Sequence, residues 1–181
     1  KVIYNKGRLH ANGGSTWSIV NRWDLYAVTY NKYRGYRLFR EYMKPTYRVR
    51  TKAECIGALK RITTSRAVFK PVFGAEGRGI VIAPKHLLIN RLKRYDGLLQ
   101  TFIDTSAGVP GVCRGYHDMR ILIMNGRVVQ SYIRSPRAGS LLANVAQGGH
   151  LREIPISQIP RAARTISSAV DRVFKKFGAR A

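Results

Sequence analysis

The spacing of apolar and polar residues divides the first third of the chain into short strands and helices. In residues 1–30, apolar runs such as KVIY and LYAVTY alternate with Asn and Gly, which predicts strands joined by loops. Over 32–43, apolar and aromatic residues recur at helical spacing. Thr51 and Glu54 then form the T-x-x-E pattern of a capping box, which predicts a helix over 52–62.

The middle of the chain is predicted to be rich in strands. Two β-prone runs surround a glycine-rich turn in 66–82, a helix is expected to begin at Pro84, and 97–103 has the composition of a strand. The segment RILIMNGRVVQSYIRS predicts a β-hairpin within a meander, because Asn125 and Gly126 favour the positive φ angles of a type I′ turn.

The end of the chain, 157–177, repeats apolar residues at helical spacing and has a basic outer face, with Gly178 in the position of a C-terminal stop. The elements together predict a mixed α+β fold. A length of 181 residues suits one well-cored domain or two small lobes.

Charge is the strongest compositional feature. The chain has 33 Lys and Arg against 9 Asp and Glu, a formal net charge of +24. Such a surface attracts nucleotide phosphates, RNA, acidic polypeptides or anionic lipid, and net charge does not choose among them. Aromatic residues interleave with the basic ones over 30–42, where they could stack on bases. The alternative is a helix that buries its Tyr and Leu side chains and leaves its Arg side chains in water.

Cysteine and histidine usage excludes several classes of site. Cys55 and Cys113 provide neither a disulfide framework nor a zinc motif, and a reducing, cytoplasmic location is expected. The four histidines lack the spacing of a metal site. No apolar run is long enough to cross a bilayer and no secretion signal is present, so a soluble protein without a membrane partner is expected.

Three closely spaced glycines in FGAEGRGI, at positions 74, 77 and 79, allow backbone N–H groups to approach an anion. The segment matches neither the Walker A loop nor the dinucleotide-binding fingerprint, and a plain tight turn would also explain it. Lys70 on the upstream strand favours the phosphate interpretation, because lysine is a common point-charge partner of phosphate.

The stretch VFKPVFGAEGRGI resembles the phosphate-binding hairpin of the ATP-grasp superfamily. HDMRILIMNGRVVQSYIR, followed by ANVAQGG, is similar to the second half of its glutathione-synthetase and RimK-type branch. The resemblance implies an ATP-grasp-like two-lobe α+β architecture with antiparallel sheets, incomplete at both termini. Residues 1–30 would be a remnant of a preceding α/β domain or an N-terminal extension, 31–95 the N-terminal lobe, and 96–181 a truncated C-terminal lobe.

The resemblance also implies roles for individual residues. Lys70 would contact the α and β phosphates of ATP, the 74–79 loop would close over them, and Thr101 and Phe102 would form the hinge that hydrogen-bonds adenine through its backbone. Asp118 and Arg120 match a D-x-R motif on the nucleotide and substrate side. The implied nucleotide-binding set is Lys70, Gly74, Gly77, Arg78, Gly79, Thr101, Phe102, Asp118 and Arg120.

The implied catalytic residues are Arg134 and Asn144. Arg134 would neutralise charge on the transferred phosphoryl group. Asn144, with Gly148 and Gly149, would border the reacting carboxylate. Taken singly, each of these residues also has a plain structural interpretation: the arginines as two of many basic residues, Asp118 as the ion-pair partner of one of them, and Asn144 with its glycines as a loop.

The implied activity is ATP-dependent ligation of a carboxylate to an amine through an acylphosphate, with ATP and Mg as cofactors and an acidic peptide as one candidate substrate. In the family, the acid-x-Asn motif that holds magnesium follows the last helix, and the sequence ends at Ala181 before that motif. Two interpretations therefore stay open. One is a ligase whose metal-binding segment lies outside this sequence, and the other is a degenerate ATP-grasp domain that binds RNA or serves in a ribonucleoprotein.

Overall fold

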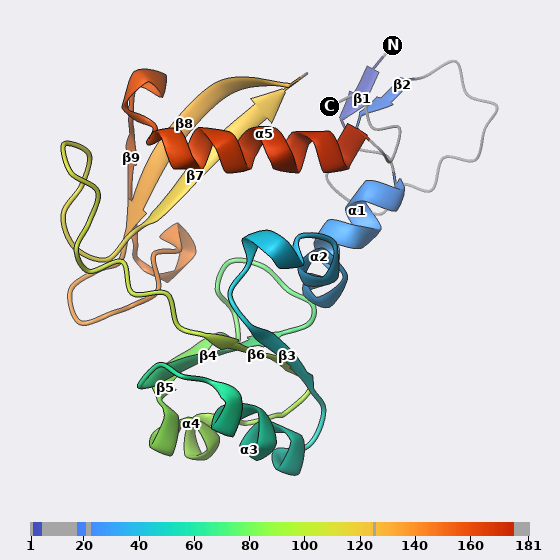
Figure 1. Ribbon diagram of the computed structural model, residues 1–181, viewed down its shortest axis with the longest axis vertical. Helices are drawn as coiled ribbons and strands as arrows, with labels where there is room; N and C mark the ends of the chain where they lie inside the picture. The colour runs from blue at the N-terminus through green and yellow to red at the C-terminus, as the bar shows by residue number, and fades with distance from the viewer. Residues whose placement is uncertain (1, 5–17, 21–22, 125, 176–181) are drawn as a thin grey trace.

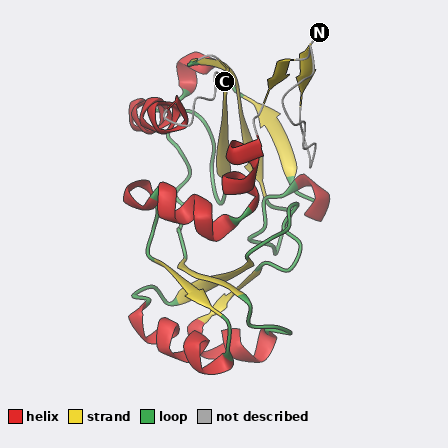
Figure 2. Cartoon of the chain, turned by 90° about the vertical axis from the view of Figure 1, so that its right-hand side faces the viewer, coloured by secondary structure: helices red, strands yellow, loops and turns green. Residues whose placement is uncertain are grey.

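The computed structural model describes residues 2–4, 18–20, 23–124 and 126–175. Two antiparallel sheets lie one above the other in Figure 1, and the turned view of Figure 2 separates their layers. The four-stranded sheet has the order β3-β6-β4-β5, the three-stranded sheet has the order β7-β8-β9, and β1 and β2 form a small parallel pair. The strands are β1 (Val2–Tyr4), β2 (Ser18–Val20), β3 (Thr46–Val49), β4 (Arg66–Pro71), β5 (Val81–Pro84), β6 (Gly97–Thr101), β7 (Asp118–Met124), β8 (Arg127–Ser135) and β9 (His150–Glu153).

Five α-helices and three short 3₁₀ helices complete the described part of the chain. The α-helices are α1 (Trp23–Tyr30), α2 (Lys32–Leu38), α3 (Lys52–Arg61), α4 (Lys85–Arg91) and α5 (Arg161–Lys175). The 3₁₀ helices are η1 (Arg40–Tyr42), η2 (Val145–Gln147) and η3 (Ile156–Gln158). The predicted α+β class with antiparallel sheets is confirmed.

Helices α3 and α4 cover one face of the four-stranded sheet (Figure 1). The main hydrophobic core lies between these helices and the sheet. The first bond of the capping box forms at the start of α3, where Thr51 Oγ1 accepts the Glu54 N–H at 3.1 Å. The Glu54 carboxylate accepts the N–H of Arg50, one residue before the N-cap, at 2.6 Å. The helix predicted over 52–62 is thereby confirmed. The core between the two helices and the sheet buries Val49, Cys55, Ala58, Ile62, Phe69, Leu88 and Leu99.

The second sheet is the predicted meander. Strands β7 and β8 form the expected hairpin, with a register shift between Leu122 and Ile123, and β9 pairs with β8 as a third strand. Gly126 has the expected positive φ of 75°, while Asn125 lies outside the described residues. Helix α5, which contacts β7, confirms the predicted C-terminal helix; Gly178 also lies outside the described residues.

Residues 1–30 depart from the prediction. KVIY does contribute the strand β1, but LYAVTY was wrongly predicted as a strand and belongs to helix α1. Tyr26 and Tyr30, one helical turn apart, stack with ring centroids at 5.3 Å, and Tyr30 meets Phe73 at 5.4 Å. These aromatic contacts outweigh the β propensity of the segment, because tertiary packing overrides weak local preferences.

The helical prediction for 32–43 holds in two pieces. Helix α2 ends at Leu38, Phe39 leaves helical geometry, and the 3₁₀ helix η1 follows. Phe39 is buried and packs edge-on against Phe174 of α5, with centroids at 5.1 Å. That contact turns the chain at Phe39. In α2, Tyr33 and Tyr36 are half-buried, whereas the guanidinium-bearing side chains beside them are exposed.

Strand β6 belongs to the first sheet, where it pairs with β3 and β4. The four-stranded sheet therefore ends at Thr101, a few residues beyond the expected boundary between 31–95 and 96–181. No helix in the described part of the chain is both long and apolar enough to span a membrane.

Candidate functional site

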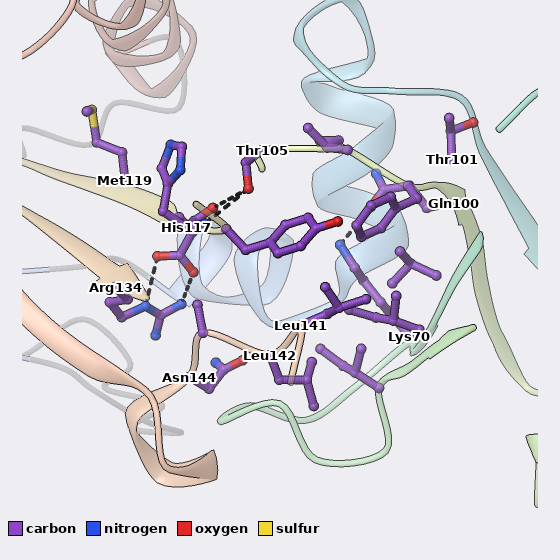
Figure 3. Close-up of a pocket in the computed structure, with 18 of the residues that line it drawn as sticks. Lys70, Gln100, Thr101, Thr105, His117, Met119, Arg134, Leu141, Leu142 and Asn144 are labelled. Carbon is purple, nitrogen blue, oxygen red and sulfur yellow. Dashed lines mark hydrogen bonds and ion pairs between the residues drawn. The ribbon is translucent and has the colours of Figure 1, made fainter. Parts of the chain in front are cut away.

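A cavity of about 430 Å³ lies between the two sheets. Lys70 on β4 and Gln100 on β6 line it from one side, and Arg134 on β8 and Asn144 line it from the other (Figure 3). Asp118 and Arg120 from β7 also line it, as do Thr101 and Phe102, the residues predicted to form the hinge. The two sheets thus bring together most of the residues that sequence reasoning singled out, although they are far apart along the chain.

Lys70 is held by its neighbours in the first sheet. Its Nζ donates to Gln100 Oε1 at 2.6 Å, and Gln100 Nε2 donates to Thr46 Oγ1 at 2.9 Å. Burial, with the nearby charge of Lys32, lowers the pKa of Lys70 below its ordinary value. Lys32 donates to the Gly74 carbonyl at 2.5 Å, and burial lowers its pKa as well. Lys70 therefore places one partly desolvated ammonium group at the cavity. Lys32 places a second one at a neighbouring hollow that Lys70 also lines, and both groups favour an anionic ligand.

Gln100 was missed by sequence reasoning. Its signal was an amide side chain near the end of the mostly apolar strand GLLQT, which is buried at four of its five positions. A polar side chain in such a strand needs a partner, and here it has two. Gln100 fixes the direction of the Lys70 side chain and is a positioning residue for it.

The opposite wall contains a two-pronged ion pair. Arg134 Nε donates to Asp118 Oδ1 at 2.8 Å, and Arg134 Nη2 donates to Asp118 Oδ2. These hydrogen bonds raise the pKa of the Arg134 guanidinium. Arg120 lies 3.6 Å from Asp118 Oδ1 and is more exposed. Asp118 thus does pair with one of the arginines, and it still faces the cavity.

We expect Asp118→Asn to lower the free energy of unfolding by about 1–2 kcal/mol, because Arg134 would remain 13% exposed without a counter-charge. Arg120→Gln, which removes only the longer contact, is expected to change it by less than about 0.5 kcal/mol. Urea unfolding of both variants measures the difference. An equal change in the free energy of unfolding for both variants would mean that the Asp118–Arg134 ion pair does not stabilise the fold more than the Arg120 contact does.

The glycine-rich loop between β4 and β5 contacts the segment that follows the second sheet's strand β8. Gln147 Nε2 donates to the Glu76 carbonyl at 3.2 Å, and a Cβ at Gly77 would lie 2.9 Å from Asn144 Oδ1. Gly77 also has a φ of 79°, so this position requires glycine for conformation and for space. The loop therefore contacts the segment that carries Asn144.

Neither Gly77 nor the other predicted loop residues line the cavity between the sheets. Gly74, Arg78 and Gly79 line a separate hollow of about 510 Å³ beside the hairpin. Arg78 is exposed and forms an ion pair with Glu76 at 2.6 Å. In this conformation the 74–79 loop stands beside the cavity, and contact between these three residues and a phosphate would require it to move.

At the predicted hinge, the backbone N–H of Thr101 already donates to the Pro45 carbonyl at 3.0 Å. A base bound in the cavity would therefore find its backbone donor at Phe102 or beyond. Phe102 lies near Tyr116, with ring centroids at 6.3 Å, so two aromatic rings adjoin the hinge. Tyr116 is a second lining residue that sequence reasoning missed.

The Asn144 segment is shaped by two glycines. Gly148 has a φ of 81° and ends η2. A Cβ at Gly149 would lie 2.5 Å from the Ala143 carbonyl oxygen, which only glycine avoids. The loop predicted around Asn144 is thus present, and it holds Asn144 at the cavity.

Residues 44–174 match the model of the RimK-like ATP-grasp domain. The chain belongs to the RimK-like ATP-grasp family. This match covers well over half of the sequence, and it includes both sheets and every residue that lines the cavity between them.

Two curated relatives support the same family. A probable alpha-L-glutamate ligase from Parasynechococcus marenigrum is 28% identical over 104 residues, which are 54% of this chain and 21% of the relative. A probable alpha-L-glutamate ligase from Maridesulfovibrio salexigens is 27% identical over 109 residues, which are 57% of this chain and 34% of the relative. The chain therefore spans about a fifth to a third of these relatives.

Solved structures share the ATP-grasp fold. The D-cycloserine synthetase DcsG superposes with a TM-score of 0.58 at 13% identity, over 87% of this chain and 57% of that one. The ATP-grasp ligase PsnB, in complex with minimal precursor, Mg and ADP, superposes with a TM-score of 0.58 at 14% identity, over 91% and 46%. At these identities the likeness establishes the fold.

Proposed function

We propose that this chain forms the nucleotide-binding part of an ATP-dependent carboxylate–amine ligase. One observation carries the proposal: Lys70, Arg134 and Asn144 line a single cavity between the two sheets, next to the hinge at Phe102. An anion-binding wall, a hinge and a second basic wall around one space suit a nucleoside triphosphate and a carboxylate bound side by side.

Lys70 and Lys32 would bind the polyphosphate. Their lowered pKa values reflect the cost of desolvating positive charge, and a bound phosphate would offset that cost. Gln100 would hold the Lys70 ammonium in place until the nucleotide binds. The backbone at Phe102 would bind the base, with the rings of Phe102 and Tyr116 beside it.

In the proposed reaction, a substrate carboxylate oxygen attacks the γ-phosphorus of ATP and releases ADP. An amine nitrogen then attacks the acyl carbon, phosphate leaves, and the amine loses a proton. Arg134 would stabilise charge on the transferred group through its Nη1, because its Nε and Nη2 already donate to Asp118. Asn144 would orient the carboxylate through its side-chain amide.

The described residues do not fit a magnesium site of their own. They contain no group of three or more His, Cys, Asp or Glu that could hold a metal ion. The carboxylate that they present to the cavity, Asp118, has both oxygens engaged by Arg134. None of the steps above therefore depends on a metal held by the described residues.

The names of the curated relatives, probable alpha-L-glutamate ligases, support glutamate as one of the two substrates. The PsnB structure with a precursor peptide and AMPPNP supports a peptide in the same way. A net charge of +24 would attract an acidic acceptor.

The direct test is hydroxylamine trapping in the presence of ATP, Mg, glutamate and an acidic peptide. An acylphosphate reacts with hydroxylamine to give a hydroxamate, which is coloured with iron and identified by mass. We expect a hydroxamate that depends on ATP and on the peptide carboxylate. ADP release without hydroxamate or amide would contradict the ligase proposal.

A further inference from the structure

A second hollow, here called the arginine–tyrosine groove, lies outside the nucleotide cavity. It has a volume of about 840 Å³ and is formed by α2, η1, the edge strand β3 and α3 (Figure 1). None of its lining residues lines the cavity of about 430 Å³ between the sheets, although Tyr36, Met43 and Thr46 also line a third hollow, beside Lys32 and Lys70. The residues that characterise it are Tyr33, Tyr36, Arg37, Arg40, Tyr47 and Arg61.

The groove has a net positive charge, because four arginines and one glutamate, Glu54, line it. Arg37, Arg40 and Arg61 are exposed, and none of them forms an ion pair with another described residue. A fourth arginine, Arg48, is already paired with Asp96. The carboxylate of Glu54, which also lines the groove, accepts the Arg50 backbone N–H and caps α3. Three guanidinium groups are therefore available to an anion.

Two of the elements that form the groove, α2 and β3, also contribute aromatic rings to it. Tyr33 and Tyr36 are half-buried on α2, and Tyr47 is half-buried on β3. The Arg61 guanidinium lies over the Tyr47 ring, 5.8 Å from its centroid, which forms a mixed cation–aromatic surface. The sequence offered two interpretations of this segment, base stacking and an amphipathic helix, and each fits some of its residues. Phe39 is buried in the core, whereas the two tyrosines of α2 line the groove.

A nucleic-acid strand, with its alternating phosphates and bases, matches this arrangement of arginines and tyrosines. Phosphates are bound well by arginine, and exposed bases stack on aromatic rings and on guanidinium planes. An acidic peptide would use the arginines but would gain little from three tyrosines. A duplex keeps its bases stacked on one another, so only a single strand can present them to the rings.

We propose that the arginine–tyrosine groove binds single-stranded nucleic acid, with phosphates on Arg37, Arg40 and Arg61 and bases on the tyrosines. This site goes beyond the proposed ligase function and does not depend on it, because the two hollows share no lining residue. A ligase domain with such a groove would be recruited to RNA or DNA.

The first test compares two triple variants of equal charge by fluorescence anisotropy with a labelled single-stranded RNA of about twelve nucleotides. Arg37→Gln/Arg40→Gln/Arg61→Gln removes the free charges of the groove. Arg114→Gln/Arg127→Gln/Arg161→Gln removes three exposed charges elsewhere. We expect the groove variant to bind at least about tenfold more weakly, with its salt slope reduced by about two, since each phosphate contact of a single strand contributes about 0.7 to that slope.

The second test separates stacking from charge. Tyr33→Ala/Tyr36→Ala is expected to lose about tenfold in affinity, whereas Tyr33→Phe/Tyr36→Phe keeps the rings and the binding. If the double alanine variant does not fold, Tyr33→Ala alone answers the question. The same oligonucleotide made as DNA shows whether RNA is preferred. The proposal holds whether the DNA binds more weakly than the RNA or equally well.

Three results would overturn the proposal. The first is an equal loss in both triple variants, which would mean diffuse attraction by the net charge. The second is undiminished binding when the tyrosine rings are removed. The third is displacement of the RNA by a poly-glutamate peptide at a similar concentration, which would assign the groove to acidic peptides. ATP-induced thermal shifts measured on the same variants report the nucleotide cavity separately, so failure of one proposal leaves the other testable.

Discussion

Lys70→Met is expected to remove most of the stabilisation that ATP gives to the folded protein. The substitution keeps the apolar stem of the side chain and removes the ammonium group that would bind phosphate. A charge-assisted hydrogen bond contributes about 1.5–3 kcal/mol, so the Kd for ATP should rise by about 10-fold to 100-fold. Thermal unfolding with and without saturating ATP measures this, because a ligand bound only to the folded state raises the Tm.

The variant is not expected to be less stable in the absence of ATP. The pKa of Lys70 is lower in the folded protein than in the unfolded chain, so charged Lys70 costs stability at neutral pH, and this cost shrinks as pH rises through the lowered pKa. Lys70→Met removes the cost, although it leaves the amide oxygen of Gln100 without its donor. Lys52→Met, at an exposed position outside the cavity, is the control and should keep the full ATP response. An unchanged ATP response in Lys70→Met would remove Lys70 from the nucleotide site.

The elements that could be predicted from the sequence are those whose signals are local. The capping box of α3, the hairpin around Gly126 and the strands on both sides of the glycine-rich turn depend on residues close to one another in the chain. The helix α1 could not be found in this way. Its β-prone residues are held in a helix by stacking within the helix and by Phe73, which is more than forty positions away.

For the candidate site, the order of motifs predicted which residues meet but not how they are engaged. Lys70, Asp118, Arg134 and Asn144 do line one cavity. No local pattern shows that Gln100 holds Lys70 across two strands, or that the Thr101 N–H is already bonded to Pro45. Similarly, the glycine spacing indicated a flexible turn but not that Gly74, Arg78 and Gly79 would face a different hollow. These facts depend on the pairing of β4 with β6 and on the packing of the two lobes.

Gly97→Ala is expected to destabilise the fold strongly, because Gly97 on β6 leaves no room for a Cβ against β4. A Cβ at this position would lie 2.5 Å from Phe69 Cε2 and 2.6 Å from the Lys70 carbonyl oxygen, and both groups belong to the buried sheet. Overpacking of this kind costs about 3 kcal/mol, which in a chain of this size corresponds to a fall in Tm of about 10 °C. Because Lys70 is adjacent, ATP binding should weaken as well.

The matched control is Gly57→Ala in the middle of α3, where a Cβ would meet no atom within 4 Å. Alanine forms helices more readily than glycine, so this change should stabilise the protein by about 0.5–1 kcal/mol. The double variant Gly97→Ala/Phe69→Leu identifies the clash: the smaller side chain removes the ring contact but not the backbone contact at Lys70, so part of the lost stability should return. If the two glycine variants change the Tm in the same direction, or if Phe69→Leu adds its full cost to that of Gly97→Ala, close packing of β6 against β4 does not hold this wall of the cavity in place.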